Sequence, residues 1–233
     1  LDGPSSCIVG YGHILILDLG LTVWYTNLVR EKEGGYMQVK AQPKNHKLGN
    51  IWNMSLPAVE TCGGMSAACA GPDGKCYVLK IYRRWPNVLK AHQDTYVGIL
   101  DALQNGEELE LATNIKNGDI LRLHVAGDFF DPAYVYAWIR LMTANPHIQF
   151  FTYTRTWRIS EMSDSLHELA ELPNMTLLLS VDRDTGYPDK ELWKGFRTAF
   201  MMVDDGDVGL VEPDTHVVLS LIHISEPTRL GMI

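Results

Sequence analysis

"LRLHVAGDFFDPAYVYAWIRLMTANPHIQFFTYT" occupies residues 121–154 and has the order strand, helix, strand. Residues 121–127 and 148–154 are short runs with β-branched and aromatic side chains, which favour buried strands. Between them, residues 131–145 begin with Asp-Pro, a capping residue followed by proline at the first helical position. This order predicts two parallel strands joined by a crossover helix.

The same pattern continues on both sides of this unit. Apolar runs at residues 176–182 and 198–204 predict two more strands. Helical patterns cover residues 86–105, with proline early and Asn-Gly at the end, and residues 159–172, where Ser160 offers a cap. We therefore expect an α/β domain of parallel strands with crossover helices, arranged as an open sheet or as a partial TIM-like barrel.

The two ends of the chain differ from the rest. Residues 219–233, "LSLIHISEPTRLGMI", match the translation of a transposon-type sequencing adapter, which predicts an adapter-derived tail. "EKEGGYM", ending at Met37, matches a translated ribosome-binding site followed by a start codon, so residues 1–36 are predicted to be translated upstream DNA. The alternative is a membrane or export segment at residues 7–29, but polar residues interrupt that run and no basic flank precedes it. The prediction is a single, C-terminally truncated α/β domain over residues 37–218.

The composition limits the class of protein. With 20 Lys and Arg against 28 Asp and Glu, the net charge is −8, which disfavours a large non-specific nucleic-acid surface but permits a local basic groove. No apolar run reaches the roughly 18 residues of a membrane span, so we expect no membrane partner. Without an export signal the expected location is cytoplasmic, where clustered cysteines indicate metal binding or catalysis rather than disulfides.

Three of the four cysteines lie in one small loop, "CGGMSAACAGPDGKCY", as Cys62, Cys69 and Cys76. Three thiolates could hold a [4Fe–4S] cluster and leave one iron open to an outside ligand. They could also hold zinc, with His92 or His124 as the fourth ligand, although zinc pairs usually have shorter spacings. The third alternative is that the cysteines bind nothing. His124 also fits a satisfied histidine of the core or rim.

Polar residues follow three of the predicted strands. Because the carboxyl ends of parallel strands meet at one edge of a sheet, where chemistry in such folds is found, these residues predict a binding site. The alternative is that they are ordinary solvated strand ends. The residues are Gly127 and Asp128, Thr154 and Arg155, and Ser180 and Asp182.

Two of these strand ends suit a ligand with amino and carboxyl groups. Gly127 would let a ligand approach the backbone, and the carboxylate of Asp128 could bind an ammonium group. Arg155 could bind a carboxylate through two hydrogen bonds. S-adenosylmethionine carries both groups and would fit the open iron of a cluster. The alternative for these residues is an ion pair between Asp128 and Arg155.

Four stretches of the chain resemble the phage gene-product-88 family over residues 44–188. They are "NMSLPAVETCGGMSAACAGPDGKCYVLKIYRRWPNVLKA", "LRLHVAGDFFDPAYVYAWI", "FFTYTRTW" and "LLLSVDRDTGYP". The family in turn is similar to radical S-adenosylmethionine proteins, which implies a radical SAM-like partial barrel. The chain departs from the family pattern in two ways: the gap between Cys69 and Cys76 exceeds the expected three residues, and Val78 stands where alanine is common.

The resemblance implies a function and a setting. It matches Cys62, Cys69 and Cys76 to the family's cysteines, and Gly127 and Asp128 to its Gly-Asp. We expect a radical SAM-like protein of a phage-infected bacterial cell that binds an iron–sulfur cluster and S-adenosylmethionine, with a substrate that is unknown but could be a nucleotide or nucleic acid. The alternative is a zinc-stabilised, non-catalytic module that binds a nucleotide or a protein. The sequence predicts no oligomeric state.

Overall fold

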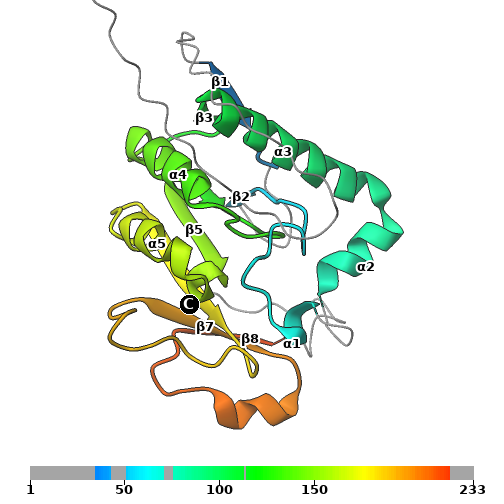
Figure 1. The fold of residues 1–233 in the computed structure, drawn as a ribbon, viewed down its shortest axis with the longest axis vertical. Helices are drawn as coiled ribbons and strands as arrows, with labels where there is room; N and C mark the ends of the chain where they lie inside the picture. The colour runs from blue at the N-terminus through cyan, green and yellow to red at the C-terminus, as the bar shows by residue number, and fades with distance from the viewer. Residues whose placement is uncertain (1–34, 43–50, 71–75, 113, 221–233) are drawn as a thin grey trace, which may run out of the picture. The chain divides into compact units, whose positions relative to one another are not determined.

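The computed structural model describes residues 35–42, 51–70, 76–112 and 114–220. Their main feature is a sheet of six strands, all parallel, in the order β2-β4-β5-β6-β7-β8. The sheet curls into a half-barrel (Figure 1). The strands are β2 (Ile51–Asn53), β4 (Ile120–Arg122), β5 (Gln149–Thr154), β6 (Met175–Val181), β7 (Arg197–Met202) and β8 (Val217–Ser220). The predicted parallel α/β fold with a partial barrel is confirmed at this level.

A separate pair of strands lies outside the half-barrel. β1 (Tyr36–Val39) pairs in parallel with β3 (Glu108–Leu111). Neither strand was predicted from the sequence, because each has only four residues and lacks a long apolar run.

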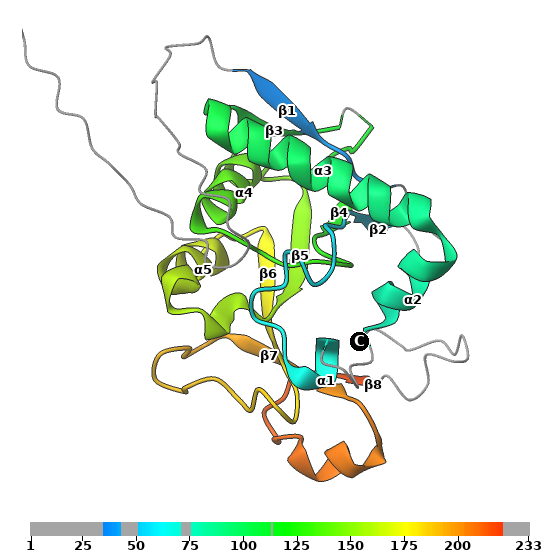
Figure 2. The ribbon, with the colours of Figure 1, turned by 45° about the vertical axis from the view of Figure 1, so that its right-hand side comes forward.

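Helices lie on two sides of the half-barrel. α4 (Pro132–Ala144) and α5 (Ser163–Ala170) lie on one side of β5 and β6, and α1 (Ala67–Ala70) and α2 (Tyr77–Arg84) on the other, while the long α3 (Pro86–Asn105) follows α2 (Figure 2). No described helix has the length and apolar character that crossing a membrane requires.

Capping residues explain two helices that the sequence predicted. α3 has proline at its first position and ends at Gly106, whose left-handed φ of 68° suits glycine. α4 is capped by Asp131, whose carboxylate accepts a hydrogen bond from the Ala133 N–H at 2.7 Å. The third predicted helix is shorter than expected: Ser160 opens a 3₁₀ turn instead of capping a helix, and α5 begins at Ser163.

The core lies between the half-barrel and the helices α4 and α5. Alternate strand residues such as Leu121, Phe150 and Leu179 pack in one cluster with Trp138 of α4 and Leu166 of α5. These side chains are almost completely buried. This arrangement leaves the other face of β4, β5 and β6 turned away from α4 and α5.

The strand predicted over residues 121–127 ends early. β4 stops at Arg122, and the backbone turns at His124 (φ 53°) and Gly127 (φ 81°), both in the left-handed region. A histidine rarely adopts this conformation, so the pattern of residue types gave no sign of the turn. The consequence is a short strand followed by a folded loop at the carboxyl edge of the sheet.

The predicted domain boundaries stay predictions. Residues 1–34 and 221–233 lie outside the described residues. Within the described residues, β8 pairs with β7 as far as Ser220, two residues beyond the boundary predicted at 218. β1 begins at Tyr36, one residue before the predicted start.

Candidate functional site at the carboxyl edge of the half-barrel

The cysteine segment, residues 54–76 with 71–75 outside the described residues, begins where β2 ends. The Val125 N–H donates to the Met54 carbonyl at 3.1 Å, and the Leu56 N–H donates to the Ala126 carbonyl at 2.8 Å. The segment therefore runs beside the loop that follows β4, over the carboxyl edge of the sheet.

Gly127 lets the cysteine segment come close to this loop. A Cβ at this position would lie 2.6 Å from both the Leu56 Cβ and the Thr61 hydroxyl oxygen, and φ is 81°. The close approach that the sequence assigned to a ligand is thus made by the protein's own chain.

Gly64 makes a second close contact. A Cβ there would lie 2.0 Å from the carbonyl oxygen of Arg155, so the segment rests directly on the backbone that follows β5. Arg158 strengthens this contact, because its Nη1 donates to the carbonyls of Gly64 (3.1 Å) and Met65 (3.2 Å). Neither Gly64 nor Arg158 was predicted from the sequence as a site residue, since neither contact has a local signal.

Asp128 joins the ends of β4 and β5 from a buried position. Its Oδ1 accepts from the Phe129 N–H (2.8 Å) and the Thr154 hydroxyl (2.7 Å), and its Oδ2 accepts from the Arg155 N–H (2.7 Å). Burial raises the pKa of Asp128 to about 6, although these hydrogen bonds oppose the shift. Both oxygens have partners inside the protein, so the carboxylate acts as a connector between strand ends.

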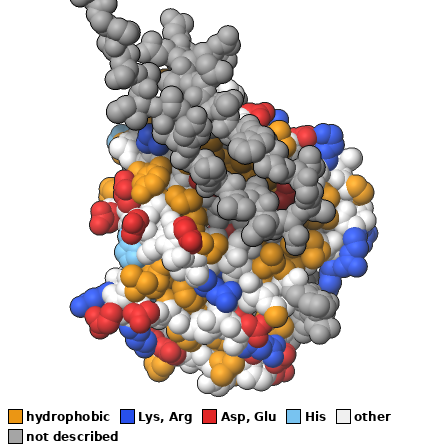
Figure 3. Space-filling model, viewed as in Figure 1, with side chains coloured by type: hydrophobic (Ala, Val, Ile, Leu, Met, Phe, Trp, Pro, Cys, Tyr) orange, Lys and Arg blue, Asp and Glu red, His pale blue; other side chains and the backbone are white. Residues whose placement is uncertain are grey.

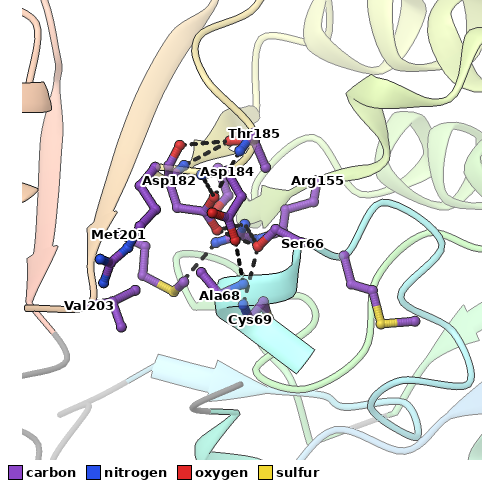
Figure 4. A network of polar contacts seen from close by, with 12 residues as sticks. Ser66, Ala68, Cys69, Arg155, Asp182, Asp184, Thr185, Met201 and Val203 are labelled. Carbon is purple, nitrogen blue, oxygen red and sulfur yellow. Dashed lines mark hydrogen bonds and ion pairs between the residues drawn. The ribbon is translucent and has the colours of Figure 1, made fainter. Parts of the chain in front are cut away.

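Arg155 forms its ion pair with Asp182 rather than with Asp128. Its Nη1 pairs with Asp182 Oδ2 and donates to the Ser66 hydroxyl at 3.1 Å, and its Nη2 lies 3.4 Å from the Met201 sulfur (Figure 4). The alternative of an Asp128–Arg155 ion pair is therefore wrong. Asp128 accepts a hydrogen bond from the backbone N–H of Arg155, and the guanidinium of Arg155 pairs with Asp182 at the end of β6.

The same network holds the start of α1. Ser66 donates to Asp182 Oδ2 at 2.5 Å and accepts from the Cys69 N–H at 3.2 Å, while the Ala68 N–H donates to Asp184 Oδ2 at 2.6 Å (Figure 4). Burial acts to raise the pKa of Asp182, but the Arg155 charge and the Ser66 hydrogen bond outweigh it, so this pKa lies below its usual value. The ion pair thus fixes the backbone of one of the three cysteines.

The three cysteines are partly buried and free of disulfides. Burial, together with smaller contributions from negative charge at Asp128, Cys69 and Cys76, raises the pKa of the Cys62 thiol to about 12. Burial also raises the pKa of Cys69, against the lowering effect of Arg155. The surroundings of Cys62 and Cys69 therefore favour the neutral thiol over the thiolate.

The donor set suits a thiophilic metal or cluster, but the side chains are not arranged around one point. Among the described residues, no three His, Cys, Asp or Glu side chains form a group that could hold a metal ion. The two histidines predicted as a fourth zinc ligand have tyrosine partners: His92 Nδ1 lies 2.8 Å from the Tyr82 hydroxyl, and His124 Nε2 lies 3.1 Å from that of Tyr134. Binding would therefore require the thiols to turn toward a common centre.

Comparison with models of known protein families assigns this chain to one of them. A family model described as "Gene product 88" matches residues 27–225. The chain belongs to this family. The resemblance expected from the sequence is confirmed, whereas the further similarity to radical S-adenosylmethionine proteins stays a prediction.

Two curated phage proteins are similar to this member of the gene product 88 family. The "Gene 88 protein" of Mycobacterium phage L5 is 42% identical over 175 residues, and that of Mycobacterium phage D29 is 38% identical over 175 residues. Each alignment covers 68% of this chain and 65% of the relative, so the chain spans about two thirds of the length of the relatives it matches. No solved structure matches the chain.

The six residues predicted to form a binding site at the strand ends of this family member divide into two groups. Gly127, Asp128, Thr154, Arg155 and Asp182 meet in one buried network at the carboxyl edge. Ser180 lies within β6, two residues before Asp182, and its carbonyl accepts a hydrogen bond from the Trp157 indole N–H at 3.0 Å. The sequence thus located the edge, but most of these residues support the cysteine segment instead of facing solvent.

Other surface features lie away from this edge. A hollow of about 440 Å³ is found at the opposite end of the sheet, where residues at the start of β6 and β7 line it together with His167, Glu171 and Lys194. On the face seen in Figure 3, the described Lys and Arg side chains are separated by acidic, apolar and uncharged ones. We place the candidate site at the carboxyl edge because the thiols and the buried charges meet there.

Proposed function

We propose that Cys62, Cys69 and Cys76 hold a [4Fe–4S] cluster at the carboxyl edge of the half-barrel, and that the protein uses it with S-adenosylmethionine as a radical enzyme does. The observation that carries this proposal is that the three cysteines lie on one segment, which contacts through Gly64, Ser66 and Arg158 fix to the strand ends. A bound cluster would supply one-electron chemistry and one iron without a protein ligand.

The residues around the thiols have a positioning role in this proposal. Arg155, Asp182 and Ser66 hold the backbone at Cys69, and the Arg155 guanidinium lowers the cost of negative charge on that thiol. Asp128 ties the ends of β4 and β5 together beneath them. Each group acts on the thiolates through structure and charge.

The S-adenosylmethionine part of the proposal rests on the number of thiols and on the family resemblance. Three thiolates leave one cluster iron open. Both Asp128 oxygens accept hydrogen bonds inside the protein and the Arg155 guanidinium is paired with Asp182, so the amino and carboxyl groups of this cofactor would need other partners at the edge. The proposal also implies a reducing compartment, the cytoplasm of an infected bacterium, because free thiols persist there.

Anaerobic reconstitution of the full chain with iron and sulfide tests the cluster. We expect visible charge-transfer absorbance together with bound iron and sulfide, and loss of both in Cys62→Ser, Cys69→Ser and Cys76→Ser. Cys7→Ser is the matched control, because it removes the fourth cysteine without touching the three thiols. A purified protein that holds zinc and takes up no iron would contradict the proposal and favour a zinc-stabilised binding module.

A second measurement separates the cofactor from the cluster. Adding S-adenosylmethionine to the reduced, reconstituted protein should change the electron paramagnetic resonance spectrum, because the cofactor would bind the open iron. If the spectrum of the cluster does not change when S-adenosylmethionine is added, the radical SAM part of the proposal is wrong, while the iron–sulfur part still holds.

A further inference from the structure

Arg122 lies on the inner face of the half-barrel, the face of β4, β5 and β6 turned away from α4 and α5. In each strand, alternate side chains such as Leu121 and Phe150 enter the helix-side core, so their neighbours point to the inner face. The strand registers place Arg122 of β4 beside Phe151 of β5, and Tyr153 of β5 beside Leu178 of β6. Because Phe151 and Tyr153 are two residues apart in β5, they lie on the same face as Arg122. Arg122, Phe151 and Tyr153 are all partly exposed, so a ligand can reach them.

Arg122 is a partly buried cation that has no carboxylate partner in the part of the chain that the structure describes. Its Nε is buried and has no hydrogen-bond partner among the described residues, and its guanidinium carbon lies 5.3 Å from the centre of the Tyr153 ring. Two other arginines have carboxylate partners, since Arg155 pairs with Asp182 and Arg140 pairs with Glu108, whereas no described carboxylate forms an ion pair with Arg122. Because burying a charge costs free energy unless it is paired, an unpaired guanidinium at this position suits a ligand anion.

Arg122 is the last residue of β4, directly before the loop that contacts the cysteine segment. The Met54 N–H, at the start of that segment, donates to the Arg122 carbonyl at 3.1 Å. Tyr77, next to Cys76, donates from its hydroxyl to the Val125 carbonyl at 2.6 Å. A ligand held at Arg122 would be next to the carboxyl edge.

We propose that the inner face binds a mononucleotide, with its phosphate on Arg122 and its base against Phe151 and Tyr153. The guanidinium offers a planar fork of donors that matches a phosphate, and aromatic side chains stack on bases with little regard to sequence. A single nucleotide is favoured over a long nucleic acid because the chain carries a net charge of −8. This inference stands apart from the proposed function, since binding at Arg122 needs no cluster.

Calorimetric titration of the metal-free full chain tests the site. The probes are adenosine 5′-monophosphate, the other three common nucleoside monophosphates, adenosine, and inorganic phosphate. We expect at least one monophosphate to bind, and to bind more tightly than either adenosine or phosphate. Arg122→Met should weaken this binding by at least about tenfold, because it removes charge-assisted hydrogen bonds. Tyr153→Leu should weaken the nucleotide and leave phosphate unchanged.

Two controls keep the result interpretable. Arg84→Met is matched to Arg122→Met, because Arg84 also lies over an aromatic ring, that of Trp85 at 4.9 Å, but is exposed on α2; it should not change binding. Arg122→Lys keeps the charge without the fork, so it should fold and retain part of the affinity even if Arg122→Met does not fold.

Several outcomes would overturn the inference. They are no binding of any monophosphate, equal affinity for nucleotide and phosphate, or unchanged affinity in Arg122→Met. S-adenosylmethionine is an additional probe, because it also joins an adenine ring to an anionic group. If it binds in an Arg122-dependent way while the monophosphates do not, the site belongs to the cofactor and the nucleotide assignment is wrong. None of these results depends on whether iron binds to the cysteines.

Discussion

Gly64 and Gly127 lie where two stretches of backbone touch. At Gly127 the space for a side chain is taken by Leu56 and Thr61, and at Gly64 it is taken by the carbonyl of Arg155. Backbone cannot move aside as the end of a flexible side chain can. These two positions therefore determine how closely the cysteine segment approaches the strand ends, and with it where the thiols lie.

Gly64→Ala should destabilise the protein. The added Cβ would lie 2.0 Å from the Arg155 carbonyl oxygen, so the segment would have to shift, at a cost of about 1–3 kcal/mol or more in the free energy of unfolding. Chemical denaturation monitored by circular dichroism measures this cost. Gly209→Ala is the control, because a Cβ at Gly209 meets no atom within 4 Å, and its stability should stay within about 0.5 kcal/mol of wild type. Equal stability of the two variants would refute the close contact.

The elements show what sequence patterns can and cannot predict. α3 and α4 were predicted closely because their signals are local: proline at the first position, Asp131 as cap and Gly106 at the end. Four strands of the half-barrel were predicted from apolar runs. β2 was not predicted, because its three residues belong to no longer apolar run, and β8 was not, because its last two residues fall in the predicted adapter-derived tail.

The candidate site was predicted in its location but not in its connections. The rule that parallel strands end at one edge brought Asp128, Arg155 and Asp182 together correctly. Which of these groups pair depends on contacts between residues 27 to 116 positions apart, such as Arg155 with Asp182 and Ser66 with Asp182. No local pattern encodes such contacts. For the same reason the supporting roles of Ser66 and Asp184 went unpredicted.

Ser66→Ala should loosen α1 without unfolding the sheet. The hydroxyl connects Asp182, Arg155 and the Cys69 N–H, so its loss leaves buried groups with fewer partners and costs about 1–3 kcal/mol. Because α1 carries Cys69, this thiol should react faster with a thiol-labelling reagent in native buffer. Ser160→Ala is the control, since Ser160 is exposed and its hydroxyl donates to the carboxylate of the neighbouring Glu161, away from this network. Unchanged labelling in Ser66→Ala would mean that the network does not hold the helix.

At the scale of the whole molecule, the half-barrel collects buried titratable groups at one edge. Burial lowers the pKa of His124 to about 3 and raises that of Asp128 to about 6. The two groups respond to pH in opposite directions. His124 stays neutral in the folded state while the unfolded state binds a proton, so its contribution to stability is lost as the pH falls from about 6.5 toward 3. Asp128 binds a proton more readily in the folded state, so its contribution is lost as the pH rises from about 4 through 6.

The two groups therefore offset each other between about pH 4 and 6, and single variants should separate them. Asp128→Asn removes the opposing term, so its free energy of unfolding should fall more steeply on acidification than that of wild type, by up to about 1.4 kcal/mol per pH unit. His124→Asn removes the other term, so its free energy of unfolding should fall less steeply on acidification than that of wild type; asparagine tolerates the left-handed backbone at this position, where φ is 53°. Urea denaturation at several pH values measures both slopes. The comparison uses slopes, so a constant loss of stability from either substitution does not matter. Two variants with the slope of wild type would show that neither group changes its proton affinity on folding, and that the edge is more open to water than its burial implies.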